Sequence, residues 1–292
     1  MNILTIDLED WFQVSNLEKR VPREAWPNCE FRLIRNTERM LQMLDDAGAK
    51  ATFFVLGWNA KRCPLLIRQI VQAGHEIATH GWEHRLIYDM SPDEFREDLR
   101  RSICAIEDAA GIRVYGHRAA SFSITEDCLW ALDVLVKEGI TYDSSMFPIR
   151  HDRYGVSRQW LEGRDVITDA GSIVEVPITV WPTMGASVPF AGGGYFRLWP
   201  YGIVRSITRA VNRAGKRVVF YFHPWEIDEG IPKVKLGLAM GLRSYVNIDS
   251  NARKLSALLG DFKFMPIRDA IRHDDLPVRT LRHSSDKRWL LV

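Results

Sequence analysis

Short runs of apolar residues alternate with amphipathic stretches along the first half of the chain. The runs have the length and composition of strands, and the stretches repeat apolar residues at the spacing of one helix face. The predicted strands are Asn2–Asp7, Ala51–Leu56, Glu76–Thr79, Val114–His117 and Ile140–Tyr142. The predicted helices are Phe31–Ala47, Pro64–Ala73, Pro92–Ala110 and Thr125–Lys137. These consecutive βα repeats predict an α/β fold around a mainly parallel sheet.

The second half of the chain is less regular. Residues 147–197 are rich in Gly, Pro and aromatic residues, and we interpret them as an irregular insertion over one face. Regular elements return as the helix Pro200–Ala214, the strand Arg217–Phe222 and the helix Asn251–Leu259. No composition shift marks a linker, so we predict a single domain over 1–292, with a C-terminal extension from about 227 and a basic tail over 277–292.

Composition places the chain among ordinary globular proteins, with 46% hydrophobic and 26% charged residues. The net charge is +2, and no long run of Lys and Arg could track a phosphate backbone, so we predict no nucleic-acid partner. The tail is locally basic, and we interpret it as a solvated terminus. Its basic residues are Arg279, Arg282, His283, Lys287 and Arg288.

The cysteines and the first residues of the chain indicate the cellular compartment of the protein. The four cysteines show no C-x-x-C spacing, which is typical of free thiols in a reducing compartment. Residues 2–6 resemble a strand rather than a signal segment, and no apolar run reaches membrane-spanning length. We therefore expect a cytoplasmic protein without an integral membrane segment.

Acidic residues cluster where the first predicted strand ends. Asp7, Glu9 and Asp10 follow each other within four positions, and strand alternation places Asp7 and Glu9 on the same face. Like charges this close repel one another, so the arrangement indicates a bound cation or a catalytic role. A surface or helix-capping cluster is the alternative.

Two histidines follow the third strand. His80 and His84 are four positions apart, and on a helical turn both imidazoles could bind one metal ion. Such a pair alone is a modest signal. It gains weight here because it follows a strand, as the acids do, and the carboxyl ends of barrel strands converge on one site.

Three further polar residues occupy predicted strand ends. Arg118 follows the fourth strand and could hold a carboxylate through two hydrogen bonds. His223 follows the apolar strand Arg217–Phe222, and it could act as a general acid if a carboxylate such as Asp143 holds it. Packing alone would rarely place all of these groups at strand ends.

These residues resemble the polysaccharide deacetylases, the group that includes chitooligosaccharide and peptidoglycan N-acetylglucosamine deacetylases. The resemblance covers roughly the whole chain. It is closest to the subgroup encoded with bacterial exopolysaccharide export genes, on three segments: Asp7–Trp11, Gly192–Arg197 and Phe220–Glu226. It implies a distorted (β/α)7 barrel and a divalent cation, usually zinc, with cobalt or nickel as alternatives.

The resemblance also implies roles for the site residues. His80 and His84 would bind the metal together with one carboxylate, and Asp7 would be the general base. Relatives usually carry two adjacent aspartates here, whereas this chain reads Asp7-Leu8-Glu9-Asp10. Strand alternation favours Glu9 as the third ligand. Asp10 is favoured by its position next to the loop and by its shorter reach, and we give it slight preference.

The remaining roles concern the base, the acid and the substrate. Arg118 would orient Asp7, although Ala120 stands where relatives usually have proline, and Asp143 would partner the general acid His223. Aromatic rings pack well against sugars, so aromatic residues near the motifs are candidates for substrate binding. These are Trp11, Trp82, Tyr195 and Trp225.

The implied activity is hydrolytic removal of N-acetyl groups from N-acetylhexosamine units of a polysaccharide or its precursor. A metal-activated water would attack the acetamide carbonyl while Asp7 accepts its proton, and His223 would protonate the departing amine. The implied partner is an N-acetylated oligo- or polysaccharide. Two alternatives are an amidohydrolase of small cyclic amides or imides on the same scaffold, and a non-catalytic carbohydrate-binding protein of an exopolysaccharide assembly.

Overall fold

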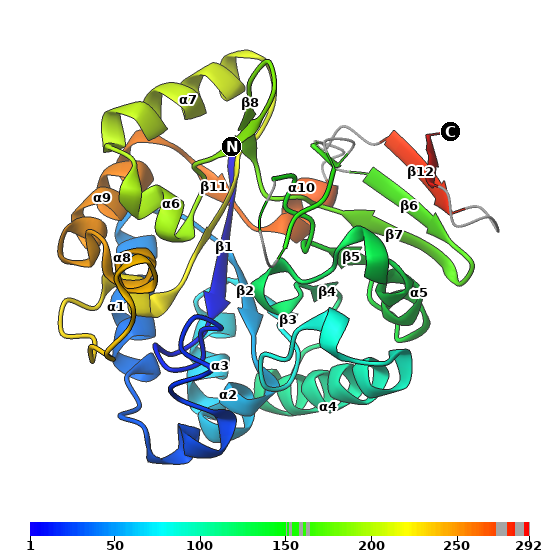
Figure 1. Ribbon diagram of the computed structural model, residues 1–292, viewed down its shortest axis with the longest axis horizontal. Coiled ribbons are helices and arrows are strands. Elements are labelled where there is room, and N and C mark those ends of the chain that lie inside the picture. The colour runs from blue at the N-terminus through cyan, green and yellow to red at the C-terminus, as the bar shows by residue number, and fades with distance from the viewer. Residues whose placement is uncertain are drawn as a thin grey trace.

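A computed structural model describes residues 1–149, 151, 154–157, 160–161, 164–272, 279–283 and 289–291. Its centre is a run of seven parallel strands in the spatial order β10-β1-β2-β3-β4-β5-β7 (Figure 1). These are β10 Val219–Phe222, β1 Asn2–Leu8, β2 Thr52–Val55, β3 Glu76–Thr79, β4 Gly116–His117, β5 Tyr142–Asp143 and β7 Gly171–Glu175. The predicted α/β fold with a mainly parallel sheet is therefore confirmed.

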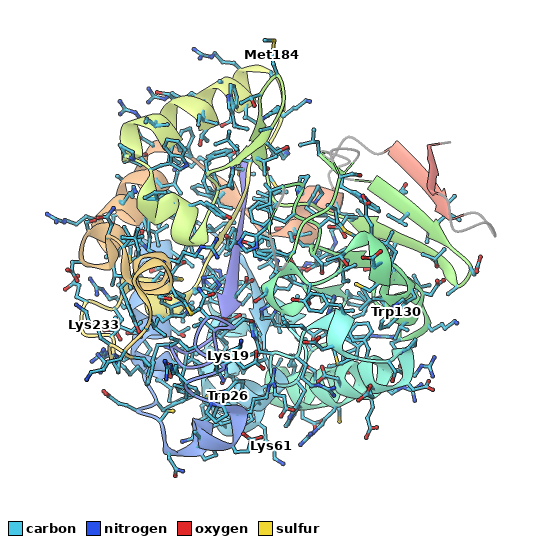
Figure 2. The ribbon with its side chains drawn as sticks, in the orientation of Figure 1. Lys19, Trp26, Lys61, Trp130, Met184 and Lys233 are labelled. Atoms are coloured by element: carbon cyan, nitrogen blue, oxygen red, sulfur yellow. The ribbon has the colours of Figure 1, made fainter. Side chains whose placement is uncertain are left out.

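Further strands extend the sheet. β6, Arg164–Thr168, lies antiparallel to β7 and parallel to β12, Arg279–His283, which pairs with β13, Trp289–Leu291. β11, Phe264–Met265, pairs with β1. A separate hairpin joins β8, Val180–Pro182, to β9, Ser187–Pro189. Met184 at its tip is fully exposed and projects from the molecule (Figure 2).

Helices cover the outside of the sheet, with α1 to α5 following the first strands (Figure 1). Their bounds are α1 Leu33–Asp46, α2 Gly57–Arg62, α3 Pro64–Gln72, α4 Pro92–Ala110 and α5 Trp130–Lys137. The later helices are α6 Gly193–Leu198, α7 Tyr201–Arg213, α8 Leu238–Tyr245, α9 Ile248–Asp261 and α10 Ile267–Arg272. Within the described residues, no helix is both long and apolar enough to span a membrane.

Alternation along β1 separates two environments. Leu4, Ile6 and Leu8 pack into the large apolar cluster that also contains the helix residues, while Ile3 belongs to a second cluster on the other face. Asp7 shares the face of Ile3, because side chains two apart in a strand point the same way. The fold therefore places Asp7 inside the barrel, at the carboxyl end of β1.

The loop between β1 and α1 is anchored by a third cluster of aromatic side chains. Trp26 packs against Phe12 and Trp58, with its ring centroid 5.6 Å from that of Trp58. This loop begins with Glu9 and Asp10. The cluster therefore fixes the backbone on which both carboxylates stand.

Two predictions for the second half were wrong. Residues 147–197 are not an irregular insertion, because they contain β6, β7, β8, β9 and α6, and β7 is one of the seven parallel strands. Their apolar runs are too short to signal strands. The tail is not simply a solvated terminus either, since the backbones of 279–283 and 289–291 pair with the sheet. Lys287 and Arg288 lie outside the described residues.

Candidate active site

The predicted site residues gather at the carboxyl ends of the parallel strands. Asp7 lies near the end of β1, His80 follows β3, Arg118 follows β4 and His223 follows β10. All strands of this run point the same way, so their ends meet at one edge of the barrel. Segments more than 200 positions apart in the chain are thereby brought together.

Arg118 holds Asp7 in place. Its NH1 nitrogen donates to Asp7 Oδ1 at 2.7 Å and to the Thr5 hydroxyl at 2.8 Å, inside a fully buried environment. The guanidinium is itself fixed by Ser144, through the backbone oxygen at 2.9 Å and the hydroxyl at 2.8 Å. Asp7 Oδ2 remains directed toward His223 Nε2, 3.8 Å away.

Glu9 joins the two histidines of the pair. Its Oε1 lies 2.9 Å from His80 Nε2 and 3.0 Å from His84 Nε2, and all three side chains are buried. Burial opposes ionisation of Glu9, but the two histidines outweigh it and hold its pKa well below the usual range. The three groups therefore place an ionised carboxylate beside two imidazole nitrogens.

The donor set fits a divalent cation. His80 Nδ1 lies 2.7 Å from the carbonyl oxygen of Arg118, which can only accept, so Nδ1 carries a proton. A neutral His80 then presents the lone pair of Nε2 toward the Glu9 carboxylate. Two lone pairs at this distance require a proton or a metal ion between them, and a carboxylate with two imidazoles is a common zinc ligand set.

The spacing of the two histidines predicts a helical turn, but the structure does not have one there. Residues 80–84 form a loop in which Gly81 has φ 77° and His84 has φ 59°. A non-glycine residue in this left-handed region is strained, and such strain is common where a side chain has to reach a site. Arg23 donates to the His84 carbonyl at 3.2 Å and supports this conformation.

Asp10 is turned away from the histidines, so the slight preference for it over Glu9 was wrong. Its Oδ2 accepts hydrogen bonds from the backbone N–H groups of Arg32 and Leu33, at 2.7 and 2.9 Å, and Oδ1 accepts from Trp11. Burial raises the pKa of Asp10 to about 6 in spite of these bonds. Asp10 therefore caps the start of α1, and its shorter reach serves the helix rather than the site.

Asp143 does not partner His223, contrary to the prediction. It accepts from His117 Nδ1 at 2.7 Å, because the two residues are register partners on the adjacent strands β4 and β5. Glu226 contacts His223 instead: its Oε2 lies 3.0 Å from both the ring Nδ1 and the backbone nitrogen. Arg197 Nε donates to the other oxygen of Glu226 at 2.9 Å.

This surrounding changes the proton affinity of His223. Burial lowers its pKa, but the adjacent Glu226, together with Glu9 and Asp7, outweighs that effect and raises the pKa to about 9. For Glu226, burial opposes ionisation, but His223 and Arg197 outweigh it and lower the pKa. At neutral pH, His223 is therefore a cation between two carboxylates.

Glu226 and Arg197 lie within the motif segments, yet sequence reasoning assigned neither of them a role. The pattern His-Pro-x-Glu could have indicated that Glu226 contacts His223. The proline starts the 3-10 turn Pro224–Ile227, and this turn brings the two side chains together. The run of glycines before Arg197 includes a position at which no side chain would fit. A Cβ on Gly192, which has φ 152°, would lie 2.0 Å from the Tyr221 carbonyl oxygen.

A pocket of about 320 Å³ opens at these residues. Its lining includes Asp7, Glu9, His84, His223 and Glu226, together with several aromatic rings. Of the four aromatic residues predicted to bind substrate, Tyr195 and Trp225 line this pocket.

Trp11 and Trp82 are not among the lining residues. Trp11 is buried in the aromatic cluster of the β1–α1 loop and donates to the Glu30 carbonyl, and Trp82 lies under the Arg101 guanidinium, 3.8 Å from it. Packing of the loops turns the Trp11 indole into the aromatic cluster and the Trp82 indole toward Arg101.

Two family models match the chain. Residues 33–140 match the model described as polysaccharide deacetylase, and residues 144–272 match one described as a domain of unknown function. The first half carries the deacetylase pattern. The gap between the two models contains β5, which pairs with β4 on one side and β7 on the other, so the sheet continues across it.

Curated relatives share shorter regions. A peptidoglycan deacetylase-like protein from Gibberella zeae is 33% identical over 110 residues, 37% of this chain and 32% of that protein. A peptidoglycan-N-acetylglucosamine deacetylase from Bacillus cereus is 27% identical over 130 residues, 40% of this chain and 46% of that protein. The chain thus matches less than half the length of these relatives.

A solved structure from Mycobacterium smegmatis, assigned to the polysaccharide deacetylases, is similar over nearly the whole length. It covers 96% of this chain and 92% of its own chain, with a TM-score of 0.60 and 22% identity. A likeness at this identity shows a shared fold. Together with the seven parallel strands, it confirms the predicted distorted (β/α)7 barrel.

Proposed function

We propose that the chain is a metal-dependent hydrolase that removes N-acetyl groups from N-acetylhexosamine units of an oligosaccharide, a polysaccharide or its precursor. The observation that supports this most directly is the convergence of Asp7, His223 and the Glu9–His80–His84 group on one pocket. The similarity of residues 33–140 to polysaccharide deacetylases points to the same reaction.

Glu9, His80 and His84 would hold the metal ion, and zinc suits this ligand set. When bound, the ion supplies an activated water and stabilises negative charge on the acetamide oxygen. Glu9 and His84 line the pocket, so the ligand group is open to substrate.

Asp7 and His223 divide the proton transfers. Asp7 Oδ2 accepts the proton of the attacking water, because Arg118 occupies the other oxygen. The water oxygen bonds to the acetamide carbon, the C–N bond breaks, and His223 Nε2 protonates the departing amine. Acetate and a free sugar amine leave.

Glu226 acts through His223 as a positioning residue. It accepts from Nδ1 and thereby directs Nε2 toward Asp7 and the pocket, while Arg197 neutralises the charge of Glu226. The segments Gly192–Arg197 and Phe220–Glu226 resemble the exopolysaccharide-export subgroup, which favours a saccharide made for export as the natural substrate.

The test is acetate release from N-acetylchitooligosaccharides before and after removal of metal by a chelator, followed by addition of zinc, cobalt or nickel. We expect activity to disappear with the metal and to return with one of the ions. Ring opening of a small cyclic imide, measured in parallel, addresses the alternative hydrolase. Metal-loaded protein that releases acetate from no N-acetylhexosamine substrate, free or lipid-linked, would contradict the proposal.

A further inference from the structure

Two leucines are exposed at the mouth of the pocket. Leu198 at the end of α6 is 56% exposed, and Leu242 in α8 is 63% exposed, and both line the pocket. Arg197 connects the two helices by donating to the backbone oxygens of Arg243 and Ser244. The leucines therefore lie on two helices that are joined through Arg197, and we call Leu198, Leu242 and Arg243 the α6–α8 rim.

The rim differs chemically from the inner wall of the pocket. Tyr221 and Trp225 line that wall and are nearly buried, and rings of this kind suit the faces of sugars. Leucine offers only aliphatic surface. A saccharide chain that is hydrophilic on all sides would leave both leucines in contact with water, whereas an alkyl chain would cover them.

Arg243 adds a positive charge beside Leu242. The acids that line the pocket already have cationic partners: Asp7 has Arg118, Glu9 has the histidines and Glu226 has Arg197. Among the described residues, the Arg243 guanidinium has neither an ion pair nor a hydrogen bond, although it is exposed and lines the pocket. A guanidinium in this setting suits a phosphate, which it can bind through two hydrogen bonds.

We propose that the α6–α8 rim binds the aglycone of the substrate, an alkyl chain joined to the N-acetylhexosamine through a phosphate. This inference rests on the proposed function, since it requires the sugar to occupy the inner pocket. The substrate class is then a lipid-linked sugar rather than a free polymer. Leu198 and Leu242 bind the chain, and Arg243 binds the phosphate.

The leucines are tested by calorimetric binding of two probes, N-acetylglucosamine 1-(octyl phosphate) and N-acetylglucosamine 1-(methyl phosphate). We expect the octyl probe to bind about tenfold more tightly, as burial of the leucine surface predicts. Leu198→Ser/Leu242→Ser should remove this preference. Leu65→Ser, on the exposed side of α3 and 74% exposed, is the matched control and should retain it. Equal affinities in the wild type, or an unchanged preference in the double variant, would overturn the inference.

Arg243 is tested with octyl N-acetylglucosaminide, which lacks the phosphate. Arg243→Gln should weaken binding of the phosphate probe about tenfold and leave the neutral glycoside nearly unaffected. Arg253→Gln, an exposed arginine of α9, should change neither. Equal losses for both probes would overturn the role of Arg243.

Vesicle sedimentation distinguishes a lipid-linked sugar from a membrane surface as the occupant of the rim. If the rim leucines mediate binding to phospholipid vesicles that contain no sugar, they bind a membrane surface and the inference fails. Probe binding does not depend on turnover, so absence of acetate release from every probe would contradict the proposed function while the rim is still judged by affinity.

Discussion

The first and second halves of the barrel build their parts of the site in different ways. In the first half, Asp7 and the Glu9–His80–His84 group are held by contacts with residues from several strands and loops. In the second half, His223 depends on Glu226 from its own turn and on Arg197 from α6. We infer from this difference that the proposed metal ligands and base belong to the scaffold, while the proposed acid and the pocket mouth adapt the scaffold to a substrate.

The largest effect should follow loss of the base. We expect Asp7→Asn to lower kcat/KM by about 10³- to 10⁴-fold, because the amide can still accept from Arg118 but cannot take a proton. Metal content and the unfolding midpoint, measured on the same preparation, should stay close to the wild type. Substantial turnover in this variant would remove Asp7 from its assigned role.

Loss of a metal ligand should rank next. Glu9→Gln should weaken metal affinity by about 100-fold or more, since the carboxylate charge is lost from the ligand set. Competition with a chelating indicator measures this change. Glu97→Gln, an exposed position on α4, is the control. Metal affinity that is equal in both variants would contradict the assignment.

Glu226→Gln replaces the carboxylate that contacts His223 in the second half of the barrel. It should lower kcat by about 10- to 100-fold, because His223 is less well oriented. Glu226 helps to raise the pKa of His223 to about 9, so its neutralisation lowers that pKa. The protonated acid is then lost at lower pH, and the alkaline limb of the pH–rate profile should move down. A purely structural role would reduce activity without moving this limb.

Asp10→Asn should affect stability rather than chemistry. The amide oxygen cannot accept all the backbone hydrogen bonds that the carboxylate accepts, so we expect a loss of about 1–2 kcal/mol in the free energy of unfolding. Urea denaturation measures it. Metal affinity should be retained, in contrast to Glu9→Gln at the neighbouring position.

The smallest effect is expected at Trp82. Trp82→Phe should leave KM for an N-acetylated saccharide unchanged, because the indole packs under Arg101 outside the pocket. Trp225→Phe alters a lining residue and should raise KM. Steady-state kinetics of the two variants, measured in parallel, test this prediction. A higher KM for Trp82→Phe alone would show that Trp82 rather than Trp225 contributes to substrate binding.

Much of the fold and part of the site could be predicted because they depend on local patterns. The strands and helices of the first half have clear periodicity, and the residues at their carboxyl ends follow from strand direction. Strand β7 was missed because Gly171–Glu175 contains too few apolar residues to stand out. Trp11 and Trp82 were misplaced because proximity in sequence to a motif does not determine which way a side chain points.

The amino-acid order alone determined the kind of chemistry available: carboxylates, imidazoles and a guanidinium at strand ends, on a parallel α/β scaffold. Only the tertiary structure decided the partners, choosing Glu9 over Asp10 for the histidines and Glu226 over Asp143 for His223. The physical reason is that hydrogen bonds and ion pairs act over about 3 Å. Strand register, helix capping and loop packing set distances on that scale, and none of them is visible in spacing along the chain.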